Sequence, residues 1–139
     1  MEAPDARLLH GVEITEQGLT IVSARLLLED GSLLPPDNTV GLGELIYCQL
    51  FVAGWQVVNG IVRPGASEII RTAQQEIILG EEDLFRNVTG ASEEDARVVT
   101  LRAGITNLHA AAKDFEVIFR IWDKVSGAGL SGAFQFHLR

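Results

Sequence analysis

The sequence has a single cysteine, Cys48, among its 139 residues, and only 6% of the residues are aromatic. One cysteine excludes an internal disulfide and any metal site built from several cysteines. Cys48 lies in the apolar run "LIYCQLF", a setting typical of a buried, unreactive thiol and not of a nucleophile. Two of the few aromatic residues are the tryptophans Trp55 and Trp122, which are considered below as possible binding residues.

Positive charge is also scarce, because eleven Lys and Arg residues are scattered among nineteen Asp and Glu residues, for a net charge of −8. Binding to phosphate backbones needs clustered basic side chains, so no nucleic-acid partner is expected. No apolar run approaches the ~18 residues of a membrane-spanning helix, so no membrane insertion is expected. The start "MEAPDARLL" lacks the features of a signal peptide. The compartment stays open: extracytoplasmic if a leader has been removed, and cytoplasmic otherwise.

Short strands separated by turn residues dominate what is present. Asp30-Gly31 and Asn59-Gly60 are pairs that favour tight hairpins, and Pro35 and Pro36 interrupt a sheet ladder. The nearly apolar segment Glu44–Val52 predicts a central strand covered on both faces. Residues 66–80 fit either a helix, with Ser67 as N-cap, or a hairpin with two pairs of isoleucines around a polar turn. We favour the hairpin because the flanking segments all have strand character.

Later segments continue the alternation of strands. "RVVTLRAGI" places every second residue on one face, and the last two strands are predicted over residues 115–122 and 130–138. "EEDLF" and "SEEDA" resemble short helical turns, with Ser92 as a candidate N-cap for the second. About eight short strands with frequent turns predict an all-β protein: a single antiparallel β-sandwich domain over residues 1–139 with a short helical insertion.

The run "FEVIFRIWDKVSGAGLSGAFQFHL" resembles the closing strand, hairpin and strand of immunoglobulin-like or C2-like β-sandwich modules. The general order of strands, turns and a small helical insert is similar to these modules too. The resemblance implies an accessory or binding module of the kind found in secreted and cell-surface proteins. For a C2-like module it also implies a calcium site, for which Asp30 and Asp123 at strand ends are the candidate ligands. The acidic runs themselves favour solvated surface residues, since no D-x-D-x-[DN]-G calcium loop is present.

The hairpin segment also contains Gly127, Gly129 and Gly132 with the spacing G-x-G-x-x-G of a dinucleotide-binding turn. That fingerprint needs a helix after the last glycine, whereas "AFQFHLR" alternates with the period of a strand. The glycines therefore predict a hairpin, and no cofactor is expected.

Neither a nucleophile elbow nor a metal site is complete in this sequence. "GLSGA" is one residue short of G-x-S-x-G, and Ser131 and His137 would lie about 20 Å apart on one regular strand. His10, His109 and His137 lack the spacing of a metal site. These gaps predict a protein that is not an enzyme.

One face of the last hairpin combines an aromatic plate with polar groups. Alternation places Arg120, Trp122, Gln135 and His137 on the same outward face. Such a combination is typical of glycan or protein recognition. The alternative is that Trp122 is an ordinary amphipathic cover, which lies under a neighbouring loop or over the stem of Arg120. Trp55, just before a tight turn, is either a binding anchor at a loop tip or a residue that fills the core. These five residues are the candidate binding residues.

The sequence therefore predicts a non-enzymatic binding or accessory module with a protein or glycan partner. Two alternatives stay open: a structural or assembly domain that pairs through an edge strand, and a calcium-dependent C2-like module. The oligomeric state is not determined by the sequence.

Overall fold

The computed structural model describes residues 8–105 and 113–139, and these form eleven strands and one short helix. The elements in chain order are β1 (Glu13–Gln17), β2 (Thr20–Leu27), β3 (Thr39–Val40), β4 (Ile46–Ala53), β5 (Ile61–Val62), β6 (Pro64–Thr72), β7 (Ile77–Glu81), β8 (Ala91–Ser92), α1 (Glu93–Ala96), β9 (Val98–Ala103), β10 (Asp114–Asp123) and β11 (Gly129–Leu138). Eight of the strands are five or more residues long, which agrees with the predicted number. Within the described residues no helix is long and apolar enough to cross a membrane.

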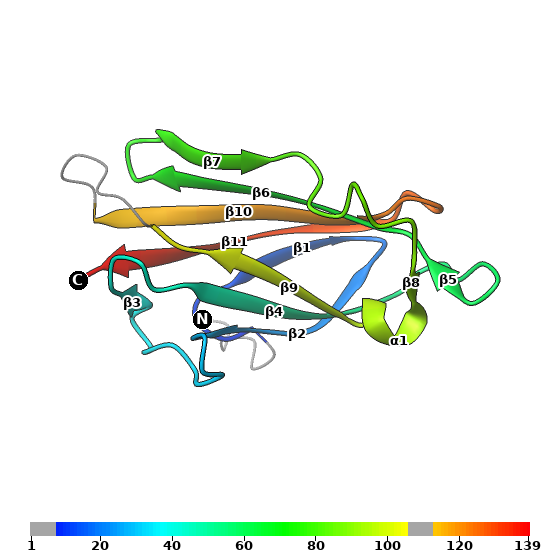
Figure 1. The fold of residues 1–139 in the computed structure, drawn as a ribbon, viewed down its shortest axis with the longest axis horizontal. Coiled ribbons are helices and arrows are strands. Elements are labelled where there is room, and N and C mark those ends of the chain that lie inside the picture. Colours follow the sequence, from blue (N-terminus) through cyan, green and yellow to red (C-terminus); the bar gives the residue numbers. More distant parts are fainter. Residues whose placement is uncertain (1–7, 106–112) are drawn as a thin grey trace, which may run out of the picture.

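Two sheets form a sandwich-like arrangement (Figure 1). The large sheet has the order β1-β11-β10-β6-β7, and β3 pairs in parallel with the end of β11. The small sheet has the order β2-β4-β9, and β5 and β8 form a separate two-stranded ladder. All the longer pairings are antiparallel. The predicted all-β, antiparallel sandwich with a short helix is confirmed.

Alternating apolar residues from both sheets fill the space between them. On β10 and β11 these are the inward residues that the alternation predicts, together with Leu130. They are Phe115, Val117, Phe119, Ile121, Leu130, Phe134, Phe136 and Leu138. The Phe115 and Phe136 rings stack at 5.2 Å between centroids, an arrangement that adds to the free energy gained from burying them. On β9 the predicted alternation is also confirmed, since Val99, Leu101 and Ala103 are buried.

Residues 66–80 form the hairpin of β6 and β7 and not the alternative helix. Ile69 pairs with Gly80 and Ile70 with Leu79, across a turn that Thr72 stabilises by accepting a hydrogen bond from the Glu76 amide at 3.2 Å. The inward residues of β6 follow a period of two, Ala66, Glu68, Ile70 and Thr72. One of these four is a carboxylate, a feature considered further below.

Strand β4 lies in the centre of the small sheet, but the prediction that both of its faces are covered was wrong. Ile46, Cys48, Leu50 and Val52 are buried, whereas the residues between them are only half-buried. The small sheet is an outer layer, so one face meets the large sheet and the other is covered only by side chains. One of these is Arg25, which bonds to Gln49 at 2.7 Å and lies over the Phe51 ring.

The predicted tight turns are present. Asn59 and Gly60 both have positive φ, and Val58 and Ile61 exchange backbone hydrogen bonds across them, as expected of this pair in a hairpin. Asp30-Gly31 closes a turn in which the Asp30 carboxylate accepts hydrogen bonds from the backbone and hydroxyl of Ser32. Ser92 caps α1 by accepting from the Asp95 amide at 3.1 Å, whereas "EEDLF" forms the end of β7 and a turn without a helix.

The G-x-G-x-x-G segment is the hairpin between β10 and β11, as predicted. Its turn is held by Asp123, a fully buried carboxylate that accepts hydrogen bonds from the amides of Val125, Ser126 and Gln56. Burial raises the pKa of Asp123, but these backbone donors outweigh it and leave the pKa below its usual value. The carboxylates of Asp123 and Asp30 thus form hydrogen bonds that stabilise the turns in which they lie. The described residues contain no group of three or more His, Cys, Asp or Glu side chains that could hold a metal ion.

Candidate functional site

The structure places Arg120, Trp122, Gln135 and His137 on one face of the large sheet but not in one place. In the β10–β11 ladder Trp122 pairs with Gly129, and at the opposite end His137 pairs with Asp114. The eight positions between Asp114 and Trp122 correspond to about 26 Å along a strand. Arg120 and Trp122 are therefore one pair, and Gln135 and His137 are another.

Trp122 covers the sheet at its own end. Its indole lies directly on Gly65 of the neighbouring strand, where an added Cβ would come within 2.6 Å of the ring. The Arg120 guanidinium lies 5.6 Å from the ring centroid on the same face, close enough for a cation–π contact. Trp122 is half-buried in this position. Both interpretations of Trp122, as a binding residue and as a cover of the sheet, stay predictions.

Trp55 lies elsewhere, in the connection after β4. It packs against the core beside a hollow of about 330 Å³ that also borders Phe51, Glu93 and Arg97. Its indole Nε1 is buried and has no hydrogen-bond partner among the described residues. None of the other four candidates borders this hollow.

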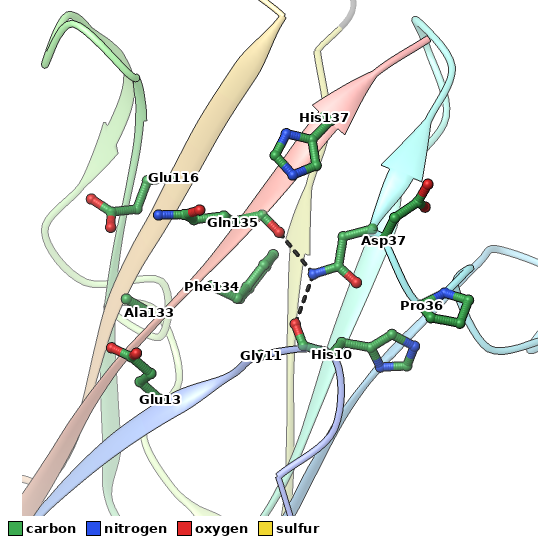
Figure 2. Close-up of a pocket in the computed structure, with 11 residues that line it drawn as sticks. His10, Gly11, Glu13, Pro36, Asp37, Glu116, Ala133, Phe134, Gln135 and His137 are labelled. Carbon is green, nitrogen blue, oxygen red and sulfur yellow. Dashed lines mark hydrogen bonds between the residues drawn. The ribbon is translucent and has the colours of Figure 1, made fainter. Parts of the chain in front are cut away.

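Gln135 and His137 lie between two hollows of the large sheet. The first has a volume of about 290 Å³ and is shown in Figure 2. Its lining is His10, Gly11, Glu13, Pro36, Asp37, Asn38, Glu116, Ala133, Phe134, Gln135 and His137. The second, of about 340 Å³, adds Thr72, Gln75 and Asp114 from the other side. Both hollows share Glu116, Gln135 and His137, and we call the surface that joins them the outer groove.

Asn38 fixes the first hollow, because it connects three segments that are distant in the sequence. It is buried with a positive φ of 57°, and its side-chain Nδ2 donates to the carbonyl oxygens of His10 at 2.7 Å and Gln135 at 2.8 Å. Its Oδ1 has no hydrogen-bond partner among the described residues. A buried acceptor without a partner costs free energy.

His10 and His137 both form hydrogen bonds with other groups of the protein. The His10 ring bonds to the Leu34 carbonyl through Nε2 at 3.0 Å, and its Nδ1 accepts from the Leu26 amide at 3.3 Å. These contacts require the tautomer with the proton on Nε2. His137 Nδ1 lies 2.7 Å from the Asp114 carboxylate. His109 lies outside the described residues.

Carboxylates dominate the charge of the outer groove. Glu13, Asp37, Asp114 and Glu116 all border it. Arg71 forms an ion pair with Glu116 at 2.6 Å, and both side chains are about 30% exposed. An acidic lining repels anions and offers acceptors to hydroxyl and amine donors, while Gln135 and His137 add donors. Ser131 pairs with Arg120 in the ladder, six residues along β11 from His137, so a direct Ser–His bond is absent, as expected.

Asn38, Asp37 and Glu116 border this groove but were not among the predicted binding residues. Glu116 could have been found, because it lies on the predicted outward face and pairs with Gln135 in the hairpin ladder. Asn38 and Asp37 could not, since they reach β11 through the parallel pairing of the two-residue strand β3 and the hydrogen bonds of Asn38 itself. Pairing between segments almost a hundred residues apart leaves no local signal in a single sequence.

Comparisons with known proteins identify the fold and nothing more specific. No protein-family model and no curated protein matches the chain. Among solved structures, the C-terminal domain of Wzt is similar with a TM-score of 0.56 and 15% sequence identity, over 93% of this chain and 78% of that one. The likeness supports a β-sandwich, although not specifically the immunoglobulin-like or C2-like module that the hairpin resembles. The described chain is a β-sandwich that shares its fold with the C-terminal domain of Wzt.

Proposed function

We propose that this protein is a non-enzymatic module that binds a neutral, hydroxyl-rich glycan in the outer groove. The observation that carries the proposal is the pair of hollows that share Glu116, Gln135 and His137. A sugar ring presents many hydroxyl groups, each a donor and an acceptor, and the groove offers carboxylate, amide and imidazole partners for them.

The negative charge of the protein and of the groove favours a neutral glycan over an anionic ligand. The protein carries a net charge of −8, and four carboxylates border the groove, so anionic polymers are disfavoured. The outer groove is also a poor site for a flat aromatic ligand, because Phe134, the aromatic residue of the first hollow, is buried. Hydrogen bonding is therefore the main source of affinity, which favours a neutral glycan.

Gln135→Ala is expected to weaken glycan binding about tenfold, because it removes a donor and an acceptor that both hollows share. The measurement is a panel of neutral and acidic oligosaccharides, followed by calorimetric titration of the best ligand. Gln56→Ala is the matched control, since Gln56 is exposed and borders neither hollow. Equal affinities for the two variants, or a preference for acidic sugars, would contradict the proposal.

An assembly role is the second candidate, and the observation that favours it is the free edge of the large sheet. β7 is the last strand of that sheet and exposes Ile77 to 64% and Leu79 to 41%. An apolar edge strand is a template for pairing with another strand, and a second copy of β7 is the simplest partner.

We expect edge pairing to give a dimer in solution that Ile77→Lys converts to a monomer, because a charge on the edge opposes pairing. The measurement is light scattering during size-exclusion chromatography over a range of protein concentrations. Thr20→Lys, at an exposed position of the small sheet, is the control. A wild-type protein that is monomeric at every concentration would exclude this role.

A further inference from the structure

A second cavity lies between the two sheets, where both have an edge. β7 ends the large sheet, β9 ends the small one, and the cavity between them has a volume of about 450 Å³. We call it the inter-sheet cavity. Its lining is Leu45, Glu68, Ile70, Leu79, Glu81, Leu84, Phe85, Thr100, Leu101, Arg102, Ala103 and Gly104. It shares no residue with the outer groove, and a small molecule fits a cavity of this size.

Glu68 is the unusual member of this lining. It occupies an inward position of β6 between Ala66 and Ile70, where the alternation calls for an apolar residue, and only 3% of its surface is exposed. Its Oε1 has no hydrogen-bond partner among the described residues. A buried carboxylate oxygen without a partner is costly, so a group that the protein itself does not supply would relieve it.

None of the charged or titratable groups around Glu68 in the described residues forms a hydrogen bond with its Oε1. Glu81 is its partner across the β6–β7 ladder, but Glu81 is already paired with Arg86. Arg102 comes from β9, and its charge partly offsets the desolvation that raises the pKa of Glu68 to about 7. From β4, Cys48 has its own pKa raised, chiefly by burial and secondly by the charge of Glu68.

We propose that the inter-sheet cavity binds a primary amine carried on an apolar body, with the ammonium group on Glu68 and the apolar part against Leu79, Leu84 and Phe85. An ammonium group has three donors and no acceptor, so it supplies both a hydrogen bond and the opposite charge. The charged residues of the lining are Glu68, Glu81 and Arg102, and Glu81 is already paired with Arg86. The group that lacks a partner is a carboxylate, which attracts a cation and repels an anion. The amine can belong to a free small molecule or to a lysine side chain of a protein partner.

The test is calorimetric titration with 2-phenylethylamine, with 2-phenylethanol as its neutral analogue and with a capped Leu-Lys-Leu peptide. We expect the amine to bind more tightly than the alcohol. Its affinity should rise about tenfold between about pH 6 and about pH 8, as Glu68 becomes ionised. Tighter binding of the peptide than of phenylethylamine assigns the site to a protein partner, and the reverse assigns it to a small molecule.

Two further measurements test the role of Glu68, one with a variant and one with the wild-type protein. Glu68→Gln should weaken amine binding at least tenfold at about pH 8 and remove its pH dependence, whereas Glu29→Gln, at an exposed turn, should change neither. The wild-type protein should release protons when the amine binds near pH 7, which titrations in buffers of different ionisation enthalpy detect without any variant. Equal affinity for amine and alcohol, or no release of protons, would overturn the proposal.

Discussion

Gly132→Ala is expected to lower the free energy of unfolding by on the order of 3 kcal/mol. An added Cβ at this position would lie 2.7 Å from Cε2 of Phe119 and 2.7 Å from the carbonyl oxygen of Glu13. The first contact is with a buried core ring, and the second is with the backbone of β1, whose Ile14 pairs with Gly132. Neither neighbour can move without opening the core or the β1–β11 ladder, so the cost is that of overpacking.

Urea unfolding followed by tryptophan fluorescence measures this effect. Gly80→Ala is the matched control, because nothing lies within 4 Å of an added Cβ on Gly80. We expect the control to change stability by less than about 0.5 kcal/mol. Adding Phe119→Leu to Gly132→Ala should relieve only the contact with the ring, not the contact with the carbonyl. If Gly132→Ala were as mild as Gly80→Ala, the close packing of β1, β10 and β11 would be contradicted.

Glu68 is expected to make the protein less stable as the pH rises. Its pKa is about 7 in the folded protein, against 4.5 for an ordinary glutamate, because burial disfavours the charged form. The folded state therefore holds its proton more tightly than the unfolded state. The contribution of Glu68 to stability is full below pH 4.5 and is lost as the pH rises through 7. The total loss is on the order of 3 kcal/mol.

Glu68→Gln removes this dependence, since an amide has no charge to bury. At about pH 8 we expect the variant to be more stable than the wild type by roughly 2–3 kcal/mol, and at about pH 4.5 we expect the two to be similar. Urea unfolding at several pH values measures the difference, and Glu29→Gln should follow the wild type throughout. A constant difference between Glu68→Gln and the wild type at every pH would contradict the buried ionisation.

Glu68 also shows which features of the fold a single sequence can predict. Once residues 66–80 are a hairpin, a period of two places Glu68 between the inward residues Ala66 and Ile70. The sequence supports that hairpin only through its strand-like neighbours, because its apolar residues fit a helix equally well. The carboxylate in the interior was thus within reach of the pattern. The sequence could not predict that Glu68 lacks a hydrogen-bond partner for one oxygen, because this depends on how the edges of the two sheets meet.

The candidate binding face shows the same division. Alternation correctly placed Arg120, Trp122, Gln135 and His137 on one side of the sheet. It could not give their separation, because the ladder register decides which residues are neighbours across strands. That register puts Trp122 against Gly129 and Gly65, and it puts Gln135 beside Glu116.

By itself, the sequence determined most of the longer strands, most of the turns and the hairpin at the glycine-rich segment, because side-chain alternation and turn chemistry act between near neighbours. It did not predict β1 or the two-residue strands β3 and β8. Only the tertiary structure decided which edges stay open and which polar atoms stay unpaired. Asn38 and Glu68 each keep an oxygen without a partner among the described residues. Both result from contacts between strands far apart in the chain, and such contacts depend on the packing of two whole sheets.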